Sequence, residues 1–134
     1  TRPYPGVDEL VRELSRTAVL AVATNKPGFM ARRIVDGLGW SAVFDAVVGA
    51  RDGFHLKPDP GMLEELLRTT GIPADRTVMV GDMVVDLETA RAAAVGFVGV
   101  DWGYGPAGEL ANAGASRVAS SADELRELVL LSVS

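Results

Sequence analysis

Three short polar segments of this sequence carry the residue types that suit phosphate chemistry. They are Thr24-Asn25-Lys26, the stretch around Lys57, and the stretch from Gly81 to Asp86 with its two aspartates. A threonine hydroxyl and neighbouring amides can donate hydrogen bonds to phosphate oxygens, and a lysine ammonium offsets phosphate charge. Carboxylates are hard oxygen ligands for Mg²⁺. The three segments therefore predict a site for a phosphate and a magnesium ion.

Each polar segment follows an apolar run that predicts a strand. Strands are expected at 18–23, 44–48, 77–80, 97–100 and 117–119, and helical patterns at 7–14, 29–38, 59–71, 84–94, around Leu110 and after Ser121. This alternation predicts an α/β fold, a three-layer Rossmann-like parallel sheet with right-handed crossovers. The first run, continuous in apolar residues, is typical of a strand buried on both faces. Ligands of such sheets bind at the carboxyl ends of the strands, where all three polar segments fall.

Simpler interpretations of the same residues remain open at this point. Asp82 and Asp86 are four residues apart across a helix start, so both carboxylates can face one point, with Gly81 permitting close approach. They could instead be a helix N-cap and a solvated carboxylate. Thr24 alone could be a turn residue, and Lys57 alone a surface lysine. The occurrence of all of them after successive strands favours a common site.

Composition limits the class of protein. The 134 residues suit one domain, and the 48% hydrophobic content suits a packed core. The net charge of −5 argues against nucleic-acid or anionic-membrane partners, because both require a basic surface. Cysteine is absent, which excludes disulfides and thiolate metal sites and favours a cytoplasmic location.

The ordered motifs resemble those of a known family. Ala23-Thr24-Asn25-Lys26-Pro27, Lys57-Pro58-Asp59-Pro60 and Val80-Gly81-Asp82-Met83-Val84-Val85-Asp86 resemble the second, third and fourth motifs of the haloacid dehalogenase-like (HAD) hydrolases. Tyr4-Pro5-Gly6-Val7 and Trp102-Gly103-Tyr104-Gly105 resemble segments of the phosphoglycolate phosphatase-like branch. The ordered set is far more specific than any one motif.

The resemblance implies an enzyme, a Mg²⁺-dependent phosphatase that cleaves a small phosphorylated metabolite through an aspartyl-phosphate intermediate. By motif match, Thr24 and Asn25 hold the phosphoryl group and Lys57 neutralises the nucleophile and the phosphate. Asp82 binds Mg²⁺ directly, and Asp86 binds it through water or orients Lys57. The substrate itself is not indicated, because a cap domain sets selectivity in this family.

The family's first motif, a strand ending in Asp-x-Asp that supplies the nucleophile, has no counterpart here. No two aspartates of the sequence are separated by a single residue. We therefore expect residues 1–134 to be one HAD-like core domain, truncated at its N-terminus, without the first strand and the cap. The alternative is a non-catalytic binding or assembly module.

The first-motif strand is central in this family, so its absence predicts a gap in the sheet. Another chain or the missing N-terminal segment is expected to fill it, because unpaired buried backbone groups each cost about 1–3 kcal/mol. Two alternatives are direct pairing of the flanking strands and insertion of the tail, residues 128–133, as a strand. The tail is better explained as a helix, because Ser121 and Glu124 have the spacing of a capping box.

Two further features are expected to carry no function. Residues 103–108 match the G-x-G-x-x-G pattern of dinucleotide sites, but Pro106 restricts the loop and too little chain follows it. His55 is the only histidine, and a lone histidine is usually structural or at the surface.

Overall fold

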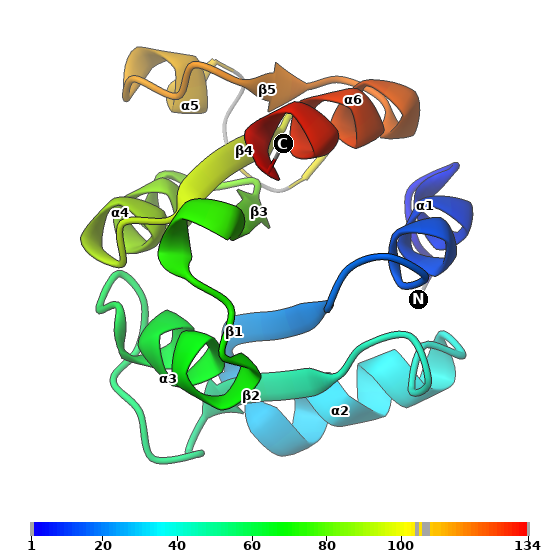
Figure 1. Ribbon diagram of the computed structural model, residues 1–134, viewed down its shortest axis with the longest axis vertical. Helices are drawn as coiled ribbons and strands as arrows, with labels where there is room; N and C mark the ends of the chain where they lie inside the picture. Colours follow the sequence, from blue (N-terminus) through cyan, green and yellow to red (C-terminus); the bar gives the residue numbers. More distant parts are fainter. Residues whose placement is uncertain (1, 104, 106–107, 134) are drawn as a thin grey trace. The chain divides into compact units, whose positions relative to one another are not determined.

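The computed structural model describes residues 2–103, 105 and 108–133 and divides into two compact units (Figure 1). Unit 1 is Thr1–Thr70 and unit 2 is Gly71–Ser134. Unit 1 contains α1 (Val7–Leu14), β1 (Ala21–Pro27), α2 (Gly28–Gly37), β2 (Ala46–Ala50) and α3 (Gly61–Thr70). Unit 2 contains η1 (Ala74–Arg76), β3 (Val78–Gly81), α4 (Val84–Ala92), β4 (Gly96–Val100), α5 (Glu109–Asn112), β5 (Val118–Ala119) and α6 (Ala122–Val133).

Unit 1 is built on a parallel pair of strands. The ladder between β1 and β2 runs from Ala21↔Ala46 to Ala23↔Val48, becomes irregular, and closes at Pro27↔Ala50. Helices α2 and α3 pack on opposite faces of this pair. Buried apolar residues from the helices and the connecting loop form the core of the unit: Leu10, Ala31, Val35, Val43, Met62 and Leu63.

The first strand differs from the expectation in both position and burial. It begins at Ala21, three residues later than predicted, and continues through Thr24-Asn25-Lys26, which we expected to lie beyond it. Its residues are half-buried or exposed rather than buried on both faces. The described part of β1 has a ladder with β2 along one edge, which leaves it less enclosed than the middle strand of a wide sheet.

Unit 2 is a three-stranded parallel sheet in the order β3–β4–β5. Helix α4 packs on β3 and β4 from one side and α6 packs on all three strands from the other (Figure 1). Strand β4 lies between two partners, and its residues Val98 and Val100 are buried. Apolar side chains from β3, α4, α5, β5, α6 and the segment between α4 and β4 complete the core: Met79, Leu87, Ala90, Ala93, Val95, Leu110, Ala119, Ala122 and Leu125. The α/β class with parallel pairing is therefore confirmed.

Several helix boundaries are where the sequence predicted them. Gly39 and Gly71, which follow α2 and α3, have φ of 75° and 72°, a left-handed conformation that favours glycine. The Asp59 carboxylate accepts a hydrogen bond from the N–H of Gly61 at 2.8 Å and caps α3. The Ser121 hydroxyl accepts from the N–H of Glu124 at 3.1 Å and caps α6.

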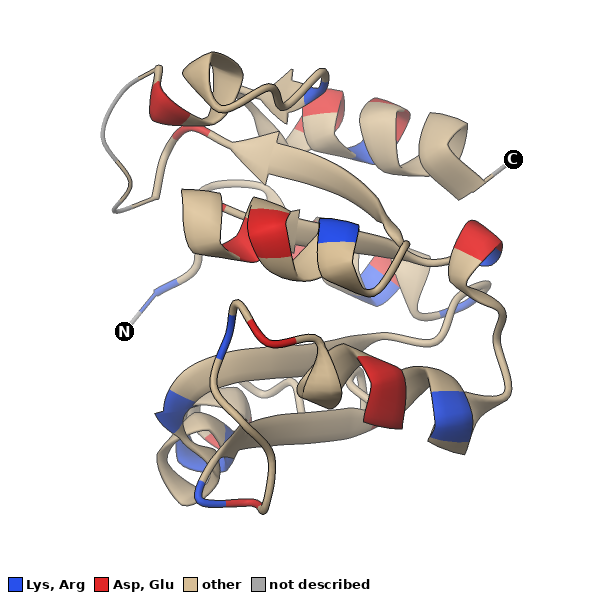
Figure 2. Ribbon diagram, turned by 90° about the vertical axis from the view of Figure 1, so that its left-hand side faces the viewer, with Lys and Arg blue, Asp and Glu red and all other residues tan. Residues whose placement is uncertain are grey.

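One expectation about the sheet gap is settled by the secondary structure. The tail forms the helix α6, so its insertion as a strand is wrong. Within the units the described strands form the ladders β1–β2 and β3–β4–β5, and the alternative of one narrowed sheet stays a prediction. Acidic and basic residues are interspersed along both units (Figure 2). Within the described ranges, no helix combines the length and the apolar character needed to cross a membrane.

Candidate functional site

Asn25 and Lys57 are joined by two hydrogen bonds in unit 1. The backbone N–H of Lys57 donates to Asn25 Oδ1 at 2.8 Å, and Asn25 Nδ2 donates to the Lys57 carbonyl at 3.1 Å. Asn25 lies in β1 and Lys57 lies in the loop between β2 and α3. The structure therefore brings together two predicted site residues that are 32 positions apart in the sequence.

Thr24 lies beside this pair, in the irregular part of the β1 ladder. Its Oγ1 accepts a hydrogen bond from the backbone N–H of Lys26 at 3.1 Å. A hydroxyl has one donor and two acceptor positions, and this bond uses one acceptor position. The contact orients the oxygen without using its proton, which suits a hydroxyl that donates to a phosphate oxygen.

The loop that carries Lys57 is also fixed on its far side. The N–H of Asp59 donates to the Leu56 carbonyl at 3.0 Å, and the Asp59 carboxylate caps α3. Lys57 is therefore positioned between Asn25 of β1 and the start of α3. His55, in the same loop, is exposed.

A second set of hydrogen bonds in unit 1 is centred on Asp52, a residue that was not among the predicted site residues. Its carboxylate accepts from the Gly49 N–H at 2.9 Å and from both terminal nitrogens of Arg32 at 3.2 and 3.3 Å. The hydrogen bond from Arg32, and after it the one from Gly49, lowers the pKa of Asp52. A Cβ on Gly28 would lie 2.1 Å from Asp52 Oδ2, so the carboxylate packs directly on the start of α2. The only sequence signal was an aspartate shortly after a strand.

In unit 2, Asp86 is a buried carboxylate at the start of α4. Only 5% of its surface is exposed, and its Oδ2 accepts from the N–H of Met83 at 3.3 Å. This burial excludes the interpretation of Asp86 as a solvated helix carboxylate. A Cβ on Gly81 would lie 2.4 Å from the Asp86 Cβ, so glycine is required for the two to approach.

Asp82 is enclosed by a different loop, the one that follows β4. A Cβ on Gly103 would lie 2.2 Å from Asp82 Oδ2, and one on Gly105 would lie 2.2 Å from the Asp82 carbonyl oxygen. The glycines of the predicted loop Trp102-Gly103-Tyr104-Gly105 thus serve to accommodate Asp82. Tyr104, Pro106 and Ala107 lie outside the described residues, and so does the expectation that 103–108 is no dinucleotide loop.

The donor set of unit 2 partly fits Mg²⁺. Asp82 and Asp86 place two hard oxygen ligands at the carboxyl end of β3, and Mg²⁺ is usually held by one or two carboxylates together with water and phosphate oxygens. Among the described residues, no three acidic, histidine or cysteine side chains form a metal-binding cluster. Further ligands would have to come from a substrate, from water or from another segment.

The predicted site residues thus form one group in each unit, Thr24, Asn25 and Lys57 in unit 1, and Asp82 and Asp86 in unit 2. Thr24 and Asn25 lie within β1, Lys57 lies in the loop between β2 and α3, and Asp82 and Asp86 lie between the end of β3 and the first turn of α4. The prediction that the two groups meet at one site stays a prediction.

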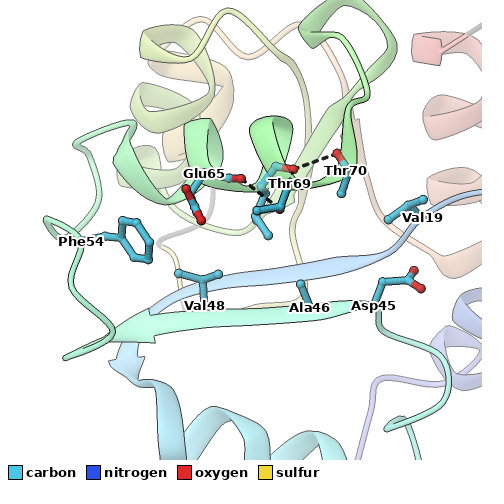
Figure 3. Close-up of a pocket in the computed structure, with 9 residues that line it drawn as sticks. Val19, Asp45, Ala46, Val48, Phe54, Glu65, Thr69 and Thr70 are labelled. Atoms are coloured by element: carbon cyan, nitrogen blue, oxygen red, sulfur yellow. Dashed lines mark hydrogen bonds between the residues drawn. The ribbon is translucent and has the colours of Figure 1, made fainter.

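A cavity of about 540 Å³ in unit 1 lies apart from these residues, between β2 and α3 (Figure 3). Its polar lining is engaged within the unit, since the hydroxyls of Thr69 and Thr70 donate to the carbonyls of Glu65 and Leu66. The carboxylate of Asp45 accepts from the N–H of Leu20 at 3.1 Å. None of the predicted site residues lines this cavity.

Comparison with known proteins places these observations in a family. Residues 1–100 match the family model described as haloacid dehalogenase-like hydrolase. A phosphoglycolate phosphatase of Mesorhizobium japonicum is 39% identical over 105 residues, which are 78% of this chain and 46% of the relative. One from Rhodospirillum rubrum is 41% identical over 75% of this chain and 42% of the relative. The chain therefore spans about half the length of the curated relatives it matches.

Solved structures share the same architecture. The crystal structure of a predicted phosphatase from Clostridium acetobutylicum superposes with a TM-score of 0.86 and 31% identity. The match covers 96% of this chain and 60% of that one.

Proposed function

The chain belongs to the haloacid dehalogenase-like hydrolase family, and we propose that it forms most of the core of a Mg²⁺-dependent phosphate monoester phosphatase. The observation that carries the proposal is the placement of its three motifs at carboxyl ends of parallel strands, with Lys57 held against the motif that contains Thr24. The names of the relatives support phosphoglycolate, a small phosphorylated acid, as the substrate.

Unit 1 supplies the groups that bind the phosphoryl group. The Thr24 hydroxyl donates to a phosphoryl oxygen, and the Asn25 segment lines the same position. The Lys57 ammonium offsets negative charge that builds on the phosphoryl oxygens and the attacking group. Such preorganised charge stabilisation is the largest part of catalysis in phosphoryl transfer.

Unit 2 supplies the carboxylates that hold the metal ion. Asp82 would ligate Mg²⁺ directly, and Asp86, buried and fixed by the Met83 N–H, would ligate it through water or orient Lys57. When bound, Mg²⁺ would screen the charge of the phosphate and orient it for attack. The protein's own contribution is to present both carboxylates between the end of β3 and the first turn of α4.

The nucleophile is proposed to come from polypeptide outside this sequence. No Asp-x-Asp pair occurs in residues 1–134, and the chain covers less than half of the first relatives it matches. We propose that an Asp-x-Asp strand, carried by an N-terminal segment or by a second chain, supplies the nucleophile.

A kinetic experiment tests these roles. The test uses a protein in which this chain is joined to a polypeptide that supplies the Asp-x-Asp motif. Release of phosphate from phosphoglycolate is measured in the presence of Mg²⁺. Lys57→Met and Asp82→Ala should each lower kcat by about 10³-fold or more, because each removes charge stabilisation made in the transition state. The control Arg68→Gln removes an exposed ion pair on α3 and should leave kcat unchanged. Full activity in Lys57→Met or Asp82→Ala would refute the assignment.

A further inference from the structure

We propose that Asn25 is a positioning residue whose side-chain amide holds the backbone of Lys57 and so determines where the lysine ammonium stands. The inference rests on the proposed function and deepens it, because it assigns to the Asn25 side chain a task other than direct contact with the phosphoryl group. It is carried by the two reciprocal hydrogen bonds between Asn25 and Lys57.

The geometry of this contact resembles the pairing of two backbone segments. A side-chain amide offers one acceptor and one donor side by side, as a neighbouring strand does. Asn25 presents both to a single residue, accepting from the Lys57 N–H at 2.8 Å and donating to the Lys57 carbonyl at 3.1 Å. Each polar atom of the side chain therefore makes a hydrogen bond to Lys57.

The contact matters because Lys57 lies in a loop rather than in a strand or a helix. On one side the loop is tied to α3 by the Asp59 cap, at 2.8 Å from the Gly61 N–H. On the other side, the side-chain amide of Asn25 connects the loop to β1 through its two hydrogen bonds. A long lysine side chain can place its charge reproducibly only if its backbone is fixed, and a displacement of about 1 Å can cost roughly 10²-fold in rate.

The same strand pair offers a matched control at its opposite end. There the Asp45 carboxylate accepts from the N–H of Leu20 at 3.1 Å, while the Asp45 N–H donates to the Leu20 carbonyl at 2.7 Å. Asp45→Ala removes the side-chain hydrogen bond between the segments that lead into β1 and β2. It leaves the carboxyl ends of the strands untouched. The Asp45→Ala variant therefore measures any general loss of stability in unit 1.

The first arm of the test measures the contact itself in the 134-residue chain. Amide hydrogen exchange at Lys57 should become roughly fivefold to tenfold faster in Asn25→Ala and stay at the wild-type rate in Asp45→Ala. Equal acceleration in both variants, or none in Asn25→Ala, would overturn the inference. This arm does not depend on enzymatic activity.

The second arm is a double-mutant cycle in the active protein described above. Asn25→Ala should lower kcat by about 10- to 100-fold with little change in KM, because a misplaced ammonium weakens transition-state stabilisation. In a Lys57→Met background the same substitution should cost less than about twofold, since the residue it positions is gone. An undiminished cost in that background would show that Asn25 contacts the phosphoryl group itself, and the inference would fall.

The failure of the proposed function would look different. If Lys57→Met alone left kcat unchanged, with Asn25 intact, the catalytic use of Lys57 would be refuted and the positioning role with it. Fast Lys57 exchange in Asn25→Ala would then identify the contact as purely structural.

Discussion

At the carboxyl end of β1, hydrogen-bonding side chains hold the candidate site residues, whereas at the carboxyl end of β3, glycines make room for them. Asn25 binds the backbone of Lys57 through its amide, at 2.8 and 3.1 Å. Asp86 and Asp82, by contrast, lie where a Cβ on Gly81 or on Gly103 would come within 2.4 Å of them.

The difference follows from the work proposed for each unit. A lysine on a loop has many rotamers and needs a fixed backbone, which side-chain hydrogen bonds supply. A pair of carboxylates must approach each other and the backbone closely, and only glycine leaves that space. Substitutions should therefore act in opposite ways. Removing the Asn25 amide should disturb the candidate site residues of unit 1, and adding a Cβ at Gly81 or Gly103 should disturb those of unit 2.

The largest effect is expected from adding one methyl group at the end of β3. In Gly81→Ala the new Cβ would lie 2.4 Å from the Cβ of buried Asp86, an atom that moves only with the backbone. We expect a loss of about 1–3 kcal/mol in the free energy of unfolding, from urea titrations followed by circular dichroism. The control Gly96→Ala, whose new Cβ would have its nearest neighbour at 3.5 Å, should change stability by less than about 0.5 kcal/mol. Equal stability of the two variants would contradict the account.

A second effect is expected from Gly103→Ala, which acts on Asp82. The new Cβ would lie 2.2 Å from Asp82 Oδ2 and 2.4 Å from the Asp82 Cβ, so the carboxylate must leave its present position. Mg²⁺ affinity, measured by calorimetry on the active protein, should fall about 10- to 100-fold, as for other groups that orient metal ligands. Unchanged affinity in a folded variant would show that the Asp82 carboxylate is not a ligand.

Features whose determining residues are neighbours in the chain were predicted correctly. Gly39, Gly71, Asp59 and Ser121 each end or begin a helix through contacts with residues a few positions away, and all four were predicted.

The errors and omissions concern contacts between distant residues. Polar Thr24-Asn25-Lys26 was interpreted as a loop, yet the chain stays extended there and rejoins β2 at Pro27↔Ala50. The partner of Asn25 lies 32 residues away, and the partner of Asp52 on α2 lies 20 residues away. No local pattern carries such information, because a hydrogen bond across the fold depends on where the strands bring the two residues.

The smallest expected effect is on the stability of unit 1 at acidic pH. Hydrogen bonds from Arg32 and Gly49 lower the pKa of Asp52, so the folded state favours its ionised form. The contribution of ionised Asp52 to the free energy of unfolding is present above the unfolded-state pKa of about 4. It is lost as the pH falls through the lower folded-state pKa. The stability difference between the wild type and Asp52→Asn should therefore shrink as the pH is lowered from 7 to below 4, in urea titrations at each pH.

Arg32→Met tests the cause of that pH dependence. In the wild-type background it should remove most of the stability that depends on Asp52, and in the Asp52→Asn background it should cost markedly less. If the difference in unfolding free energy between the wild type and Asp52→Asn stayed constant from pH 7 to pH 3, a stabilising ion pair between Asp52 and Arg32 would be ruled out.

The central proposal is that residues 1–134 hold the phosphate-binding and metal-binding residues of a phosphatase site and lack its nucleophile, and phosphate release tests it most directly. The chain is assayed with phosphoglycolate and Mg²⁺, first alone and then with an Asp-x-Asp polypeptide joined to it. We predict no turnover alone, turnover after joining, and loss of that turnover in Asp82→Ala. Turnover by the chain alone that falls in Asp82→Ala would contradict the account, because it would show a working site that needs no further motif.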